Sequence, residues 1–214
     1  MKKLDAIILA AGYGRRLRPL TLRRPKPLIR FGGKPLILHA MEVLMAAGVS
    51  RFLINAFWLS DRIKSFLEGT FGMEVVLSRE RVLLGTGGGI KQFGEMVGPV
   101  FIVHNSDIVH RINISGAVRK LMDSDALGLM ILVDGHANSV LVKGDSICGF
   151  EKGKGLTYTG ISVFRKQFLK YLPERGSLVE GVRRAIGEGR KILAHPTDEP
   201  WMDAGDIRLH SGTD

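Results

Sequence analysis

The chain has 214 residues, of which 45% are hydrophobic and 24% charged, and 31 basic residues against 21 acidic ones give it a net charge of +10. This composition excludes an intrinsically disordered protein and predicts a globular chain whose length suits one domain. The excess of positive charge attracts anions, a class that includes nucleic acids and phosphorylated small molecules.

Apolar runs of strand length alternate with amphipathic runs of helix length through the first part of the chain. Strands are expected at 5–9, 49–56, 73–77, 100–104 and 127–133. Helices are expected between them at 35–47, 60–71, 88–96 and 115–122. This alternation predicts an α/β fold, with a Rossmann-like, mostly parallel mixed sheet flanked by helices.

The pattern changes after residue 134. A hairpin is expected from strands at 139–142 and 147–151, with its turn at 143–145. Further strands at 156–164 and 192–195, helices at 166–172 and 177–188, and a short helix after 201–205 complete the prediction. Because the sequence shows no repeat and no linker, we expect a single domain over 1–214.

Two features indicate the compartment. Cys148 is the only cysteine, so an internal disulfide is impossible and a reducing cytoplasm is the simplest setting. It stands in an apolar run, where a buried side chain is expected. The apolar run at 4–11 is too short for a membrane span and lacks a cleavage site, so we interpret it as a buried strand rather than a signal peptide.

A glycine-rich loop with a basic tail follows the first strand. Gly12 and Gly14 allow the close backbone approach that a phosphate group requires, and Arg16 and Lys26 would add full charges. The loop is not a Rossmann fingerprint, because Leu17 stands where the third glycine belongs, and it lacks the Gly-Lys-Ser/Thr of a P-loop. Glycines alone are a weak signal, but the added basic and proline residues favour a phosphate pocket.

The run Leu-Ala-Ala-Gly-Tyr-Gly-Arg-Arg-Leu-Arg-Pro-Leu-Thr at 9–21, with Pro-Lys-Pro-Leu at 25–28, resembles the signature of the sugar-phosphate nucleotidylyltransferases. The run at 156–162 and Trp-Met-Asp-Ala-Gly at 201–205 look like the N-acetylmuramate-1-phosphate uridylyltransferase branch, and Leu-Gly-Thr-Gly-Gly at 84–88 also matches heptose-1-phosphate guanylyltransferases. The resemblance implies the nucleotide-diphospho-sugar transferase fold. It also implies a nucleotide-binding half at 1–134, a sugar-phosphate-binding half at 135–214 and no C-terminal β-helix domain.

The same resemblance implies the site residues. Four would be catalytic: Arg16, Lys26, Asp107 and Asp203. Two of these, Asp107 and Asp203, would also be the ligands of a Mg²⁺ cofactor, since Mg²⁺ takes one or two protein carboxylates together with waters and phosphates. The nucleotide would be bound by Leu9, Ala11, Gly12, Tyr13, Gly14, Arg15, Arg16, Lys26, Thr86, Gly87 and Gly88. The sugar phosphate would be bound by Asn105, Glu151, Lys152 and Gly160.

The implied reaction joins a nucleoside triphosphate to a sugar 1-phosphate and releases pyrophosphate, by in-line attack on the α-phosphorus. UTP with N-acetylmuramate 1-phosphate or a related sugar is the first expectation, in cell-wall recycling or surface polysaccharide synthesis, and GTP with a heptose or mannose 1-phosphate is the alternative. Departures from the family pattern at Ser106, Val82, Leu83 and Asp206 leave the sugar and the base open.

Other classes of protein fit less well. A noncatalytic nucleotide-sugar sensor would tend to lose one of the four catalytic candidates, and a phosphocholine-type cytidylyltransferase would not match the run at 159–161. A nucleic-acid-binding protein would show a basic helix or aromatic-rich strands, which are missing. No histidine spacing suggests zinc. His104 is interpreted as a strand residue with a hydrogen-bonded ring, and because it stands three residues before Asp107, a role in supporting this metal ligand is the alternative. We expect no nucleic-acid or membrane partner, and the oligomeric state stays open.

Overall fold

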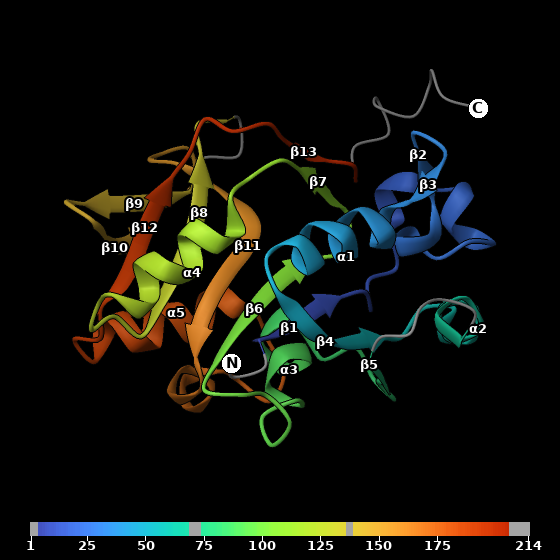
Figure 1. Ribbon diagram of the computed structural model, residues 1–214, viewed down its shortest axis with the longest axis horizontal. Helices are drawn as coiled ribbons and strands as arrows, with labels where there is room; N and C mark the ends of the chain where they lie inside the picture. The colour runs from blue at the N-terminus through green and yellow to red at the C-terminus, as the bar shows by residue number, and fades with distance from the viewer. Residues whose placement is uncertain (1–3, 69–73, 136–138, 206–214) are drawn as a thin grey trace.

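A computed structural model describes residues 4–68, 74–135 and 139–205. Its centre is a nine-stranded mixed sheet with the order β5-β4-β1-β6-β11-β8-β12-β10-β9 (Figure 1). The four strands β5, β4, β1 and β6 run parallel, whereas β11 is antiparallel to both of its neighbours. The predicted α/β fold with a mostly parallel mixed sheet is therefore confirmed.

The elements follow in chain order. The strands of the main sheet are β1 (Leu4–Leu9), β4 (Val49–Ala56), β5 (Glu74–Arg79), β6 (Val100–Asn105), β8 (Gly128–Val133), β9 (Val140–Lys143), β10 (Ser146–Phe150), β11 (Thr157–Arg165) and β12 (Ile192–Pro196). Two small ribbons pair β2 (Arg30–Phe31) with β3 (Lys34–Pro35), and β7 (Ile108–His110) with β13 (Trp201–Asp203). The α-helices are α1 (Leu36–Ala46), α2 (Ser60–Glu68), α3 (Gly85–Lys91), α4 (Ile114–Met122) and α5 (Leu178–Gly187). The 3₁₀ turns are η1 (Arg15–Leu17), η2 (Leu20–Leu22), η3 (Lys26–Leu28) and η4 (Lys166–Tyr171).

Alternate residues of the central strands face two different hydrophobic cores, because successive side chains of a strand point to opposite faces of the sheet. Ala6 and Ile8 of β1 pack into the core that α1, α2 and α4 cover. Ile7 packs into the second core, under α3, η4 and α5. Since both faces are covered, the central strands are apolar along their length, as parallel strands usually are. This layering leaves the carboxyl ends of the strands free to build a site.

Several predicted elements need correction. The helix expected at 88–96 begins at Gly85 and ends at Lys91, because the glycine run itself forms the helix. The helix expected at 166–172 is the 3₁₀ segment η4. Cys148 is exposed rather than buried, since it lies on the outer side of β10, near the edge of the sheet. The helix expected after residue 205, the departure at Asp206 and the end of the helix expected at 60–71 lie outside the described residues.

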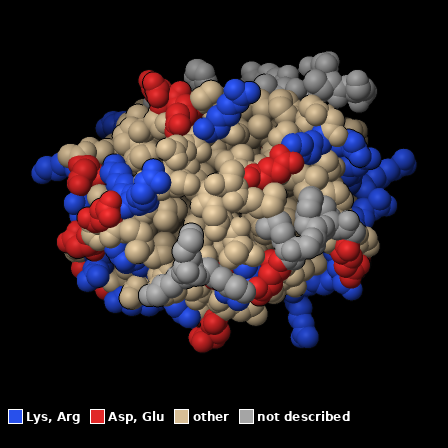
Figure 2. All heavy atoms as spheres, viewed as in Figure 1, with Lys and Arg blue, Asp and Glu red and all other residues tan. Residues whose placement is uncertain are grey.

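Lys and Arg side chains are spread over the surface, and one group of them comes from a segment without acidic residues. Figure 2 shows Lys and Arg side chains crowded at the edge of the molecule formed by the segment with η1 to η3. Residues 6–41 contain no Asp or Glu at all, which accounts for this patch. Among the described residues, no helix is long and apolar enough to cross a membrane.

Candidate active site

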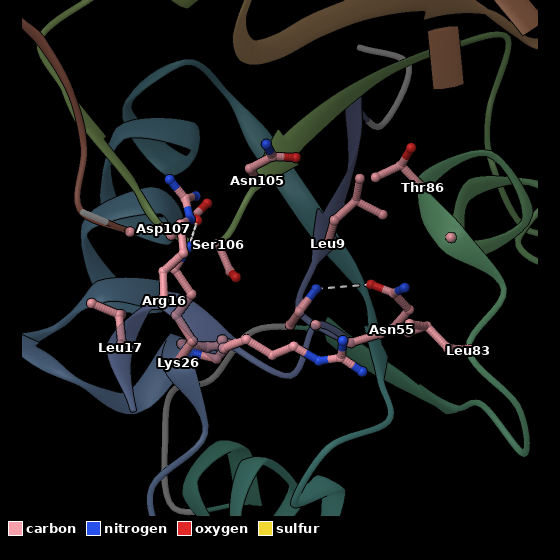
Figure 3. A pocket seen from close by; sticks show the side chains of 18 residues that line it. Leu9, Arg16, Leu17, Lys26, Asn55, Leu83, Thr86, Asn105, Ser106 and Asp107 are labelled. Atoms are coloured by element: carbon pink, nitrogen blue, oxygen red, sulfur yellow. Dashed lines mark hydrogen bonds and ion pairs between the residues drawn. The ribbon is translucent and has the colours of Figure 1, made fainter. Parts of the chain in front are cut away.

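A cavity of about 430 Å³ opens at the carboxyl ends of β1, β4 and β6, where an open α/β sheet usually binds its ligand. One wall comes from the glycine-rich loop and its basic tail, and the opposite wall from Leu83, Gly85 and Thr86 at the start of α3. Figure 3 shows Arg16, Lys26 and Asp107 on one side of this space and Leu83 and Thr86 on the other. Segments that are far apart in the sequence thus converge on a single pocket.

The glycine-rich loop gives its two glycines different roles. Gly14 has φ +62°, and a Cβ there would lie 2.7 Å from Thr21 Cγ2. The Thr21 hydroxyl donates to the Gly14 carbonyl at 2.9 Å and holds the turn closed. Gly12, by contrast, would place a Cβ with no protein atom within 4 Å, and it lines the cavity. The backbone conformation and the packing therefore require glycine at position 14. At position 12, the absence of a side chain leaves open space in the cavity.

Most of the predicted nucleotide-binding residues of this loop line the cavity, namely Leu9, Ala11, Gly12, Gly14, Arg15, Arg16 and Lys26. Tyr13 does not, because its ring packs against Phe57 and Trp58 with centroid distances of 5.6 and 5.4 Å. The Arg15 guanidinium lies 5.2 Å above the Tyr13 ring. Tyr13 therefore anchors the loop from outside the cavity.

Two carboxylates that are almost a hundred residues apart lie together opposite two cations. Asp107 is in the turn after β6, and Asp203 ends β13, which pairs with β7 directly after that turn. Lys26 forms an ion pair with Asp107 that is largely shielded from solvent, with 13% and 15% of the two side chains exposed. Arg16 pairs with Asp203 at 3.4 Å in a more exposed contact. The four predicted catalytic side chains thus form one cluster.

Gly205 permits this crowding. A Cβ at this position would lie 2.9 Å from an Arg16 guanidinium nitrogen and 2.7 Å from Asp203 Oδ1, and it would also overlap Lys26 Nζ. The Gly205 N–H donates to Asp203 Oδ1 at 2.7 Å, and the Ala204 N–H donates to the Asp107 carbonyl at 3.0 Å. The segment after β13 is therefore fastened directly to the carboxylate turn.

The donor set fits Mg²⁺. Among the described residues, no group of three or more His, Cys, Asp or Glu side chains could hold a metal ion. Asp107 lines the cavity, and Asp203 does not line it but is bonded to Gly205, which does. Two carboxylates are enough for a hard ion that keeps waters and takes its remaining ligands from phosphates. A structural zinc site, which needs four protein ligands, does not fit this cluster.

The α3 wall combines residues that line the cavity with residues that pack behind it. Thr86 lines the cavity, and its hydroxyl accepts a hydrogen bond from the Leu178 N–H at 2.8 Å. Gly87 and Gly88 are buried and do not line the cavity. A Cβ on Gly87 would lie 2.8 Å from the Ser177 carbonyl oxygen, and one on Gly88 would overlap the loop before α5. Close helix–loop packing is thus a physical reason for both glycines.

A buried polar network joins the two walls, and sequence reasoning missed it as a functional feature. Asn55 Oδ1 accepts from the Ala10 N–H at 2.9 Å, and its Nδ2 donates to Glu80 Oε1 at 2.7 Å. Glu80 Oε2 accepts from the Leu84 N–H at 2.9 Å. Asn55 lies within a predicted strand, and no sequence signal marks Glu80.

On the acceptor side, the predicted residues separate into two groups. Asn105 lines the cavity, and Gly160 (φ +84°) would place a Cβ 2.6 Å from Asn105 Nδ2, so glycine makes room for this side chain. Glu151 and Lys152 lie in an exposed turn and do not line the cavity, and Glu151 pairs with Lys154 at 2.6 Å. Ser106, which had been noted as a departure, lines the cavity and is held by a bond from its N–H to the Leu9 carbonyl at 3.1 Å.

Fold and site together define an α/β nucleotide-binding enzyme, and comparison with known proteins gives the family. The family model described as nucleotidyl transferase matches residues 5–140, and the chain belongs to this family. The N-acetylmuramate alpha-1-phosphate uridylyltransferase of Caulobacter vibrioides is 30% identical over 222 residues, which cover 94% of this chain and 91% of that protein.

Other relatives match part of the chain or only its fold. Mannose-1-phosphate guanyltransferase beta-B of Xenopus laevis is 38% identical over 112 residues, which cover 50% of this chain and 31% of that protein. The chain thus spans about a third of the length of this relative. The solved structure of HddC from Yersinia pseudotuberculosis complexed with GMP-PN has a TM-score of 0.82 at 24% identity over 96% of both chains. The inositol-1-phosphate CTP transferase from T. maritima has a TM-score of 0.85 at 21% identity, over 99% of this chain and 93% of that one.

Proposed function

We propose that this chain joins a nucleoside triphosphate to a sugar 1-phosphate, forming a nucleoside-diphosphate sugar and releasing pyrophosphate. One observation carries the proposal: Asp107 and Asp203 form ion pairs with Lys26 and Arg16 in one cluster at the cavity at the strand ends, which Asp107, Lys26 and Arg16 line. Membership of the nucleotidyl transferase family supports it. The proposal treats residues 1–214 as one catalytic unit, which the continuous sheet from β5 to β9 supports.

The chemistry needs no protein nucleophile, because the attacking phosphate of the sugar is already ionised. A sugar-phosphate oxygen forms a new bond to the α-phosphorus, while the bond from that phosphorus to the bridging oxygen breaks and its electron pair leaves with pyrophosphate. The backbone from Leu9 to Gly14 holds the nucleotide, and Arg16 and Lys26 offset the charge that builds on the leaving group. Catalysis then consists of positioning and charge stabilisation.

Asp107 and Asp203 would hold Mg²⁺, which when bound lowers the repulsion between the two phosphate groups. Lys26 and Arg16 form ion pairs with these carboxylates. The phosphates of the substrates would offer the two cations a second anionic partner, which would free the carboxylates to act as ligands.

For the acceptor, Asn105 and the backbone at Gly160 contact the sugar phosphate in our proposal, because Asn105 lines the cavity and Gly160 lies directly against its side chain. Glu151 and Lys152 are proposed as more distant contacts. Their turn carries glycines with positive φ at 153 and 155 and is bound to the neighbouring strand through the Glu151 N–H and the Ser139 carbonyl at 2.9 Å. Both charges would have to turn toward the cavity to contact the substrate.

The proposed substrates are UTP and N-acetylmuramate 1-phosphate or a related sugar, in the cytoplasm and in the synthesis or recycling of a cell-surface polymer. The full-length match to the Caulobacter vibrioides uridylyltransferase supports this pair. GTP with mannose or heptose 1-phosphate is the second candidate, supported by the higher identity to the guanyltransferase over half of the chain. A base-selective assay separates the two.

The test is pyrophosphate release with Mg²⁺ across four nucleoside triphosphates and a panel of sugar 1-phosphates. We expect release with one pair, and a loss of about 100-fold or more in Asp107→Asn. Asp145→Asn is the matched control, because this exposed carboxylate pairs with Lys191 far from the cavity. If the wild type binds nucleotide but releases no pyrophosphate with any substrate pair, the proposed enzymatic activity is contradicted, and a noncatalytic nucleotide-sugar sensor is favoured.

A further inference from the structure

Two buried histidines join the arms of the turn that carries Asp107. His104 is the penultimate residue of β6, and His110 ends β7. In the described part of the chain, β6 and β7 share no ladder: β6 pairs with β1 and β11, and β7 pairs with β13. The contact between His104 Nε2 and His110 Nε2, at 3.0 Å, links the arms instead.

The surrounding hydrogen bonds fix which ring nitrogens carry protons. The Ile112 N–H donates to His110 Nδ1 at 2.9 Å, so this nitrogen has no hydrogen, and the neutral ring carries its proton on Nε2. That proton can only be donated to His104 Nε2, so His104 carries its own proton on Nδ1. His104 Nδ1–H in turn donates to the Asn105 carbonyl at 2.6 Å. Every donor in this chain of bonds meets an acceptor when both rings are neutral.

The environment keeps both rings neutral. His104 is fully buried and His110 almost so. Burial lowers the pKa of His104 to about 3, and proximity to His110 adds to this effect. Burial also lowers the pKa of His110 to about 4, although the Glu199 carboxylate opposes the change. At neutral pH both rings are therefore uncharged and fully hydrogen-bonded. We call this His104–His110 pair the strut, because it links β6 to β7.

The strut ends close to the catalytic groups. It connects β6, whose end presents Asn105 and Asp107, with β7, whose ladder partner β13 ends at Asp203. In that ladder His110 lies opposite Trp201, while Ile108 lies opposite Asp203. Asp203 is tied to this turn through its ladder partner Ile108 and through the bond from the Ala204 N–H to the Asp107 carbonyl. A change in the spacing between β6 and β7 therefore moves the turn, with both carboxylates, relative to the end of β6.

We infer that His104 and His110 are positioning residues, whose ring-to-ring hydrogen bond holds the turn that carries Asp107 against the end of β6 and so places Asp107, with Asp203 beside it, for one shared divalent cation. The inference rests on the proposed function for its catalytic meaning, but the geometry can be tested through metal binding alone. Loss of a positioning contact around a metal site costs about tenfold or more in affinity.

The experiment measures Mn²⁺ affinity by isothermal titration calorimetry or EPR, on the full chain with and without nucleoside triphosphate. In His104→Asn and His110→Asn, the side-chain amide can take the place of the ring Nδ1 and keep the hydrogen bond that Nδ1 makes with the backbone. The hydrogen bond between the two Nε2 atoms is lost in both variants. We expect Mn²⁺ to bind about tenfold more weakly in each. The double variant should lose no more than either single variant, because both changes break the same bond.

Two controls separate positioning from loss of stability. Val182→Ala opens a cavity in the core under α5, far from this turn, and lowers the thermal midpoint without changing Mn²⁺ affinity. His110→Gln places an amide where Nε2 stood, and should restore much of the affinity that His110→Asn loses. In turnover assays the asparagine variants should lower kcat and leave the KM for the nucleoside triphosphate within about twofold.

Unchanged Mn²⁺ affinity in both asparagine variants, or an equal loss in Val182→Ala, would overturn the inference. The proposed function is tested by a different measurement, the release of pyrophosphate. If the wild type releases no pyrophosphate on any substrate pair but binds Mn²⁺, the reaction is wrong, while the metal-binding results still decide the role of the two histidines.

Discussion

Gly14→Ala should destabilise the protein, whereas Gly12→Ala, two residues earlier in the same loop, should not. Gly14 has φ +62°, a left-handed conformation that costs a residue with a Cβ about 1–2 kcal/mol. The new methyl group would also lie 2.7 Å from Thr21 Cγ2 and 3.2 Å from Lys26 Cβ. Overpacking of this kind adds about 1–3 kcal/mol. The free energy of unfolding should therefore fall by roughly 2–5 kcal/mol, the sum of these two costs.

Two variants separate the backbone cost from the overlap. Gly32→Ala has a similar φ of +55° with no atom within 4 Å of the new Cβ, so it should lose only the backbone contribution. Thr21→Ser removes Cγ2 and keeps the hydroxyl that donates to the Gly14 carbonyl. Combining it with Gly14→Ala should recover about 1 kcal/mol or more of the loss.

The assay is urea unfolding followed by circular dichroism, together with calorimetric titration of nucleoside triphosphate. Gly12→Ala meets no protein atom within 4 Å, so its unfolding free energy should stay within about 0.5 kcal/mol of the wild type. Its nucleotide affinity should fall by about tenfold or more, because the new methyl group enters the space proposed for phosphates. Equal unfolding free energies for Gly14→Ala and Gly32→Ala, or undiminished nucleotide binding by Gly12→Ala, would refute this reasoning.

Three further predictions concern the carboxylates and the histidines. Glu80→Gln should lower the unfolding free energy by about 1–3 kcal/mol in urea, because one buried donor loses its acceptor, whereas the exposed control Glu42→Gln should change it by less than about 1 kcal/mol. Asp203→Asn should unfold like the wild type, since its partner is exposed, yet bind Mn²⁺ at least tenfold more weakly by calorimetry. Acidification from pH 6.5 to about 4 should destabilise the wild type more steeply than the double variant of His104 and His110 to asparagine, in urea titrations at each pH.

The sign of the pH effect follows from the lowered pKa values. Both histidines have a pKa well below 6.5 in the folded protein, so the unfolded chain takes up protons first as the pH falls. Their contribution is complete above pH 6.5 and declines by up to about 1.4 kcal/mol per pH unit for each ring below it. Parallel slopes for the wild type and the double variant would contradict the neutral strut. For the other two predictions, the contrary results are a Glu80→Gln protein as stable as Glu42→Gln, and undiminished Mn²⁺ binding in Asp203→Asn.

The parts of this molecule that could be predicted from sequence are those encoded by local pattern. Alternation of strands and helices gave the sheet, and the glycine-rich run with Arg16 and Lys26 gave the loop. The partners of buried polar groups could not be predicted, because Asn55 with Glu80, and His104 with His110, meet only when the chain folds. The predicted start of the helix at residue 88 was wrong, because α3 begins at Gly85. Glycine has a low helix propensity, but packing of the run at 85–89 against residues 173–177 outweighs it.

The proposed transfer is tested most directly by following the α-phosphorus of the nucleotide. Wild-type protein receives a nucleoside triphosphate labelled with ³²P at the α position, Mg²⁺ and the sugar 1-phosphate that supports pyrophosphate release. We predict that the label appears in the nucleoside-diphosphate sugar, never on the protein, and that Asp107→Asn abolishes the transfer. Label recovered as nucleoside monophosphate, or bound covalently to the protein, would contradict direct transfer between the two phosphates.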